Sequence, residues 1–260
     1  MLHGWGGSAE SFSPLIQELK NLDKSLSPQV LKFFMPTFPG FGDSPAPEKP
    51  WDTKDYADWL DTELKKNKIN PFTQEVVFYG HSFGCRVIVR WLMAHPDFKG
   101  KIILTGAAGI KWPLSFKQRC IQHLANFSRK FRKPAHKKRS KPSLQETKSF
   151  WGKCYRKMAR IFGFGDWSES DIALKPTLQK VLAEEDLRIY LPHITNQVLL
   201  IWGAKDTYTP LKSAQVFHSS LPHNELVVIP DGKHGIHYTH KAMIAKLVGD
   251  FVTHTVSDPF

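Results

Sequence analysis

Short apolar runs alternate with longer amphipathic stretches along most of this 260-residue chain. Five near-continuous apolar runs have the pattern of parallel strands that are buried on both faces, namely VLKFFMP (30–36), EVVFYG (75–80), KIILTG (101–106), QVLLIWG (197–203) and ELVVIP (225–230). Five stretches have helical periodicity, namely residues 10–22, 52–66, 83–95, 210–221 and 237–253. Alternating strands and helices predict an α/β fold with a doubly wound, mostly parallel sheet.

The interval between the runs at 101–106 and 197–203 is about ninety residues long, which is too long for a crossover connection. It contains helical patterns but no convincing strand pattern. We therefore expect an inserted helical lid over residues 111–192 that covers the carboxyl edge of the sheet. The core is then formed by a first part, residues 1–110, and a second part, residues 193–260.

The net charge of +12, from 36 Lys and Arg against 24 Asp and Glu, is concentrated in one segment. Residues 111–165 hold 16 Lys and Arg and a single acidic residue, Glu146. This charge can be the solvated exterior of the lid, which is the interpretation we favour. It can also be a surface for weak contact with an anionic membrane or an anionic substrate. A nucleic-acid patch has no binding motif to support it, so we expect no nucleic-acid partner.

Composition excludes several classes of protein. The hydrophobic content of 41% is too high for a wholly disordered chain. The three cysteines, Cys85, Cys120 and Cys154, cannot all pair and lack the spacing of metal ligands. No apolar run approaches the roughly 20 residues of a membrane span, and the N-terminus lacks the pattern of a signal peptide. We therefore expect a cytoplasmic protein without a metal or an organic cofactor, and the oligomeric state stays open.

The pentapeptide GHSFG (80–84) lies directly after one apolar run and directly before a helical stretch. A G-x-S-x-G motif in this setting places its serine on a strained turn, which the small flanking glycines permit. The serine hydroxyl is then raised above the sheet. Ser82 is therefore the candidate nucleophile.

A serine hydroxyl needs a general base, and the base needs a carboxylate that orients it. Asp206 follows the apolar run at 197–203, and His234 follows the run at 225–230. Because loops at the carboxyl ends of parallel strands converge on one edge of the sheet, we expect both side chains near Ser82. The chain order Ser, Asp, His is typical of a serine triad that uses this motif.

Other histidines and carboxylates compete for these two roles. His237 and His240 lie close to His234, but on the helical stretch that follows it, where we expect packing or surface residues. The acidic run 184–186 falls in the last helical pattern of the lid, where a charged run is usually a solvated face. We therefore keep His234 as the candidate base and Asp206 as the candidate acid.

A glycine-rich turn, HGWGG (3–7), supplies the third element of a candidate site. Acyl transfer needs backbone N–H donors around the oxyanion that develops on the substrate. The N–H of Phe83, directly after Ser82, lies at a helix start, where the helix dipole also helps. We expect the second donor to be the N–H of Trp5.

Five motifs occur in a single order, namely HGWGG (3–7), FPGFGDS (38–44), GHSFG (80–84), WGAKD (202–206) and GKHG (232–235). With these motifs the sequence resembles the α/β-hydrolase superfamily, specifically its lidded single-domain branch of esterases and carbon–carbon bond hydrolases. The resemblance implies an α/β-hydrolase fold with Ser82 as nucleophile, Asp206 as acid and His234 as base. It also implies an oxyanion hole formed by the N–H groups of Trp5 and Phe83.

A serine nucleophile narrows the activity. Epoxide and haloalkane hydrolases resemble this sequence elsewhere but attack with an aspartate, whereas a serine implies an acyl-enzyme and a carbonyl substrate. We expect a serine hydrolase of class EC 3.1.1 that cleaves a small or medium carboxylic ester or a related acyl compound. A carbon–carbon bond hydrolase and a non-hydrolytic ligand-sensing protein on the same fold are the alternatives.

The start of the chain departs from the family pattern. The family has two edge strands and a central strand before the HG motif, whereas here only Met1 and Leu2 precede His3. The resemblance places that central strand between the runs at 30–36 and 75–80, so we expect roughly 20 to 30 residues to be missing upstream. The 260-residue chain is then expected to express poorly or aggregate, with Trp5 poorly anchored.

Overall fold

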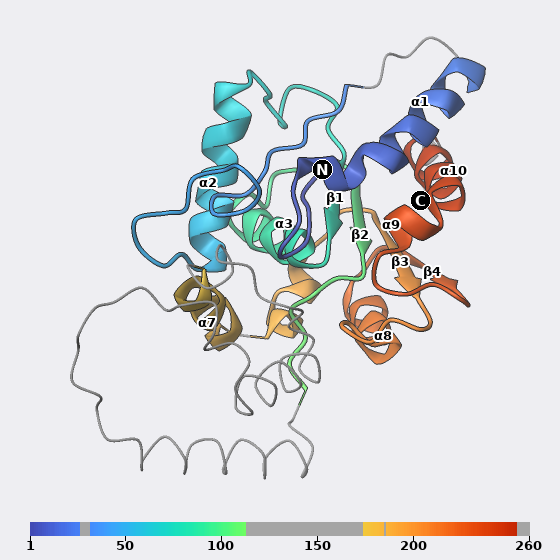
Figure 1. Ribbon diagram of the computed structural model, residues 1–260. Coiled ribbons are helices and arrows are strands. Elements are labelled where there is room, and N and C mark those ends of the chain that lie inside the picture. The colour runs from blue at the N-terminus through green and yellow to red at the C-terminus, as the bar shows by residue number, and fades with distance from the viewer. Residues whose placement is uncertain (27–31, 113–173, 185, 254–260) are drawn as a thin grey trace, which may run out of the picture. The chain divides into compact units, whose positions relative to one another are not determined.

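Figure 1 shows the computed structural model of the chain, which describes residues 1–26, 32–112, 174–184 and 186–253. The internal contacts divide the chain into two compact units, one of residues 1–110 with 167–260 and one of residues 111–166. The fold described below is that of the first unit. Residues 113–173 lie outside the described part of the chain. They include most of the predicted lid and most of its basic segment.

A parallel sheet with the strand order β1-β2-β3-β4 forms the centre of this unit. Its strands are β1 (Phe78–His81), β2 (Ile102–Thr105), β3 (Val198–Gly203) and β4 (Asn224–Ile229). Every residue of β1, β2 and β3 is buried, as their near-continuous apolar runs predict for strands covered on both faces. Four of the five predicted strands are therefore confirmed.

The first residues of the chain lie along the edge of β1. Leu2 forms an isolated parallel bridge with Gly80. The Leu2 N–H donates to Tyr79 O at 2.8 Å, and the His81 N–H donates to Leu2 O at 3.0 Å. The amino group of Met1 donates to Phe34 O at 2.6 Å. The chain start thus contacts β1 through Leu2 and the segment around Phe34 through Met1.

The predicted strand at 30–36 is wrong for the residues that the structure describes. Residues 32–36 form no strand, and residues 27–31 lie outside the described part of the chain. In and near this segment, the amino group of Met1 donates to Phe34 O, and a ring nitrogen of His3 accepts the Phe38 N–H at 3.0 Å. A strand needs successive backbone pairs, and these contacts do not supply them.

Helices occupy all five stretches in which helical periodicity predicted them. They are η1 (Ala9–Phe12), α1 (Ser13–Leu26), α2 (Thr53–Lys66), α3 (Phe83–Ala94), α8 (Leu211–Ser220), α9 (Ile236–Thr239) and α10 (Lys241–Thr253). The described end of the predicted lid adds α7 (Lys175–Ala183), η3 (Leu187–Ile189) and η4 (Leu191–His193). None of the helices in the described ranges combines the length and the apolar composition that a membrane span requires.

Two hydrophobic clusters cover opposite faces of the sheet. Neighbouring residues of a strand point to opposite faces. Accordingly, Ile102 and Leu104 belong to the cluster that includes residues of α2, α3 and α8, whereas Ile103 belongs to the cluster that includes residues of α1, α9 and α10. Figure 1 shows α1 and α10 side by side. This arrangement confirms the doubly wound architecture.

Glu184, directly after α7, lies in an ion pair rather than on a solvated face. Its carboxylate accepts from Arg86 Nη2 at 2.9 Å and from Arg86 Nε at 3.2 Å, and also from the backbone N–H and the hydroxyl of Thr53. The side chain of Arg86 is 6% exposed and that of Glu184 is 20% exposed. The expected solvated face is therefore wrong at Glu184, because its partners lie on α2 and α3.

Glu184→Leu is expected to lower the free energy of unfolding by about 3 kcal/mol, because it removes the carboxylate that the buried Arg86 contacts. The control is Lys54→Met, which breaks an ion pair with Asp58 whose side chains are 65% and 56% exposed. Such a surface pair contributes at most about 1 kcal/mol. Urea unfolding of both variants measures the difference, and equal losses would contradict a structural role for Glu184.

Candidate active site

Ser82 occupies a strained turn between β1 and α3. Its φ of 51° and ψ of −109° are unusual for a residue with a side chain. A Cβ added at Gly80 would lie 2.8 Å from the backbone nitrogen of Cys85, and one added at Gly84 would lie 2.1 Å from Leu2 O. Both positions of the GHSFG motif therefore require glycine, and the turn has the strand-to-helix setting that the sequence predicts.

The structure brings Ser82, His234 and Asp206 together, as the sequence predicts. His234 Nε2 lies 3.0 Å from Ser82 Oγ, and His234 Nδ1 lies 2.7 Å from Asp206 Oδ2. A carboxylate can only accept, so Nδ1 carries the proton and Nε2 is free to accept the serine proton. The Asp206 side chain is 1% exposed and that of His234 is 20% exposed. The geometry is that of a nucleophile, a base and an orienting carboxylate.

The environment of Asp206 keeps it ionised. Burial by itself raises the pKa of the Asp206 carboxyl, but the hydrogen bond with His234 and the electrostatic interaction with the same ring act against burial. The backbone N–H groups of Tyr208 and Thr209 also donate to Asp206 Oδ1, both at 2.9 Å. The interactions with His234 and Thr209 hold the pKa of Asp206 below its usual range.

Thr209 belongs to this site, and sequence reasoning missed it. Its hydroxyl lies 2.8 Å from Asp206 Oδ2, 3.1 Å from Gly106 O and 3.3 Å from His234 Nδ1. The sequence signal was a hydroxyl residue three positions after the candidate acid, in DTYTP. Asp side chains often bond the backbone two or three residues on, so this loop could have been interpreted as a local cap around Asp206.

Phe83 directly follows Ser82, and the side chain of Trp5 contacts that of Phe83. The Trp5 ring packs edge-on against the Phe83 ring, with centroids 5.3 Å apart. A Cβ added at Gly4 would lie 3.2 Å from Ser82 Cβ, so the HGWGG turn approaches the nucleophile closely. The Phe83 N–H begins α3 and has no intrahelical acceptor. Among the described residues, no hydrogen bond is made by the Trp5 N–H.

His237 and His240, which competed with His234 for the role of base, are a packing residue and a surface residue, as the sequence predicts. His237 is buried on α9, with its ring centroid 4.3 Å from that of His81 and 5.5 Å from that of Phe12. His240 is paired with the exposed Asp231 at 3.1 Å. His237 therefore packs in the core, and His240 lies near the surface.

Two buried histidines next to the site resist protonation. Burial lowers the pKa of His81 well below its ordinary value, and the nearby His237 and His234 lower it further. Burial, together with His234, lowers the pKa of His237 from 6.5 to about 4. The His81 and His234 ring centroids are 4.7 Å apart. The neutral His81 ring therefore packs against the candidate base, and the neutral His237 ring packs against His81.

The low pKa of His237 is expected to make the fold less stable in acid. Its pKa in the folded state, about 4, lies below the ordinary value of 6.5, so the unfolded chain binds a proton first as the pH falls. Its contribution to stability is complete above pH 6.5 and decreases towards pH 4, by up to about 1.4 kcal/mol per pH unit. Urea unfolding at pH 6 and pH 5 should show a smaller pH dependence for His237→Phe than for the wild type. An unchanged dependence would contradict this assignment.

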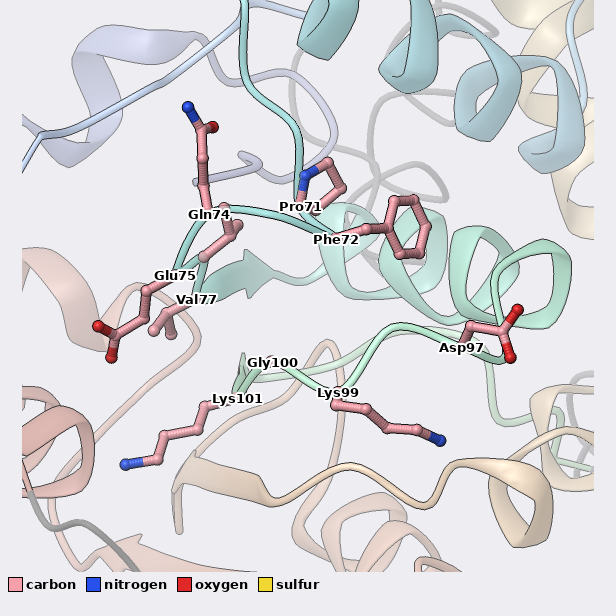
Figure 2. Close-up of a pocket in the computed structure, with 10 residues that line it drawn as sticks. Pro71, Phe72, Gln74, Glu75, Val77, Asp97, Lys99, Gly100 and Lys101 are labelled. Atoms are coloured by element: carbon pink, nitrogen blue, oxygen red, sulfur yellow. The ribbon is translucent and has the colours of Figure 1, made fainter.

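A cavity of about 580 Å³ lies at the amino ends of β1 and β2, at the end of the sheet opposite the candidate active site. Figure 2 shows its lining, which comes from the segments before β1 and before β2, including Glu75, Asp97, Lys99 and Lys101. Both segments lie at the amino ends of their strands, whereas Ser82 follows the carboxyl end of β1. The cavity therefore contains none of the predicted site residues.

Across the described residues, no three His, Cys, Asp or Glu side chains gather in a way that could hold a metal ion.

Comparison with known proteins adds independent findings. A family model described as alpha/beta hydrolase fold matches residues 1–241. The pimeloyl-[acyl-carrier protein] methyl ester esterase of Vibrio vulnificus is 25% identical over 237 residues, covering 90% of this chain and 86% of that protein. The enzyme of the same name from Neisseria meningitidis is 24% identical over 264 residues, covering 100% of this chain and 78% of that protein.

Solved structures agree on the architecture. An esterase from Exiguobacterium antarcticum superposes with a TM-score of 0.67 at 19% identity, covering 97% of this chain and 91% of that chain. At such low identity the likeness concerns the fold alone, which is the one that the sequence predicts.

Proposed function

The chain belongs to the alpha/beta hydrolase fold family, and on this premise we propose that it is a serine-dependent carboxylic ester hydrolase that works through an acyl-enzyme. The observation that carries the proposal is the hydrogen-bonded array of Ser82, His234 and Asp206 at the carboxyl edge of the sheet. The esterase names of its curated relatives support the same class of reaction.

Each residue of the array has a defined chemical step. Ser82 Oγ attacks the ester carbonyl while His234 Nε2 takes its proton, and the ionised Asp206 stabilises the imidazolium that forms. The N–H groups of Trp5 and Phe83 stabilise the oxyanion. His234 then protonates the leaving alcohol, and a water molecule that it activates releases the acid from Ser82.

The relatives suggest a substrate to test, and the sequence suggests a lid that would contact it. The relatives are named for the methyl ester of a pimeloyl chain on an acyl-carrier protein, so an ester of this kind is the first substrate to test. We keep residues 111–192 as a proposed lid. Its basic segment, residues 111–165, is proposed as a solvated exterior, with contact to an anionic substrate or, weakly, to an anionic membrane as the alternative.

Turnover of esters tests the proposal. We expect the protein to release p-nitrophenol from p-nitrophenyl butyrate and methanol from a pimeloyl-carrier methyl ester over many catalytic cycles. A single burst equal to the enzyme concentration would indicate a non-hydrolytic binding protein. Cleavage of a vinylogous diketone without cleavage of any ester would indicate a carbon–carbon bond hydrolase. Either outcome would overturn the ester hydrolase assignment.

A further inference from the structure

His3, two residues before Trp5, is buried, and both of its ring nitrogens are hydrogen-bonded. The residue is 1% exposed. His3 Nδ1 lies 2.8 Å from Gly4 O, and the Phe38 N–H donates to His3 Nε2 at 3.0 Å. A carbonyl oxygen only accepts and a backbone N–H only donates, so the ring must carry its proton on Nδ1. Burial lowers the pKa of His3 to about 4, which keeps this neutral form at neutral pH.

The carbonyl that His3 holds belongs to the same peptide unit as the Trp5 N–H. The Gly4–Trp5 bond is trans, since the described residues contain no cis peptide, so the Gly4 C=O and the Trp5 N–H point in opposite directions. Gly4 O also accepts the Gly7 N–H at 3.1 Å. Two donors therefore fix the carbonyl, and the expectation of a poorly anchored Trp5 is wrong. Rotation of the peptide that would turn the Trp5 N–H breaks both bonds.

The same turn approaches the nucleophile at Gly4. A Cβ at Gly4 would lie 3.2 Å from Ser82 Cβ and 3.0 Å from His81 Cδ2. The His3 ring is itself held in place, with its centroid 4.7 Å from that of Phe38 and 5.7 Å from that of Phe41. His3 thus links the turn beside Ser82 to the FPGFGDS segment, and the proposed mechanism gives this ring no chemical step.

We propose that His3 is a positioning residue that fixes the Gly4–Trp5 peptide and thereby aims the Trp5 N–H at the oxyanion. This inference rests on the proposed ester hydrolysis. An oxyanion donor acts mainly in the transition state. Loss of the His3 Nδ1 bond should therefore lower kcat and leave KM nearly unchanged.

Two amide substitutions separate the roles of the two ring nitrogens of His3, because each keeps one of its two hydrogen bonds. In His3→Asn, the side-chain NH₂ can occupy the place of Nδ1 and still donate to Gly4 O, while the bond to Phe38 is lost. In His3→Gln, the amide oxygen can reach the place of Nε2 and still accept from Phe38, while the bond to Gly4 is lost. Each variant loses one buried hydrogen bond, so the pair is matched for stability.

We expect His3→Gln to lower kcat for p-nitrophenyl butyrate by about 10- to 100-fold, less than the ~10²- to 10³-fold that removal of an oxyanion donor costs. His3→Asn should stay within about threefold of the wild type in kcat, as its Gly4 bond survives. Affinity for a boronic acid transition-state analogue should fall in parallel with kcat. If the wild type is active and the two variants have equal kcat values, the proposed role of His3 is overturned. The proposed ester hydrolysis is not affected by that result.

Two further outcomes complete the test. An inactive wild type would overturn the proposed function and the role of His3 with it. Should neither variant fold, ¹⁵N NMR of the wild-type histidines decides the matter. The His3 ring, identified through its contact with the Phe38 amide, must carry its proton on Nδ1 at pH 7, and a proton on Nε2 would overturn the proposal.

Discussion

Ser82→Ala is expected to lower kcat for p-nitrophenyl butyrate by about 10⁴- to 10⁶-fold, with the fold unchanged. The hydroxyl is the only group of Ser82 that can form the acyl-enzyme. Its removal leaves the strained turn intact, because an alanine side chain keeps the Cβ that already fits at φ 51°. Steady-state kinetics and thermal unfolding of the purified variant measure the two parts of this prediction.

The control for Ser82→Ala is Ser219→Ala, an exposed serine near the end of α8 that donates to Val216 O. This variant should keep the wild-type kcat. Retention of most activity by Ser82→Ala would show that another group attacks the ester. Loss of folding in Ser82→Ala alone would show that the serine has a structural role at the turn.

Asp206→Asn is expected to lower kcat by about 10⁴-fold. Asp206 Oδ1 accepts two backbone N–H groups, from Tyr208 and Thr209. An asparagine keeps these bonds only if its oxygen stays there, which turns its NH₂ toward His234 Nδ1. His234 must then accept on Nδ1 and carry its proton on Nε2, facing Ser82 Oγ, where it cannot take the serine proton.

Asp231→Asn is the matched control, because Asp231 also pairs with a histidine, His240, but its side chain is 73% exposed. It should leave kcat unchanged. The defect of Asp206→Asn should also persist at high pH, since it arises from the wrong tautomer and not from a missing charge alone. A loss below about tenfold would contradict the orienting role of Asp206.

Much of the fold was predictable because its signals are local in the sequence. The runs that contain β1, β2 and β3 are apolar throughout, since both faces of these strands are covered. Ser82, Asp206 and His234 each follow the carboxyl end of a parallel strand, so the topology alone brings them to one edge.

Other features depend on contacts between distant segments. Glu184 has the sequence context of a solvated charged run, and its buried partner Arg86 is 98 positions away. The run at 30–36 has a strand-like composition, but residues 32–36 form no strand, because a strand also needs a neighbour with successive backbone pairs. The bonds of His3 likewise depend on Phe38, which packs against the ring from another motif.

Peptide mapping by mass spectrometry after reaction with a fluorophosphonate tests the central claim most directly. Such a probe forms a stable adduct only with a serine whose hydroxyl is activated by a base. We predict a single adduct on Ser82, formed at a rate that falls sharply in Asp206→Asn and abolished in Ser82→Ala. An adduct on another residue, or ester hydrolysis by a protein that the probe does not modify, would contradict the account.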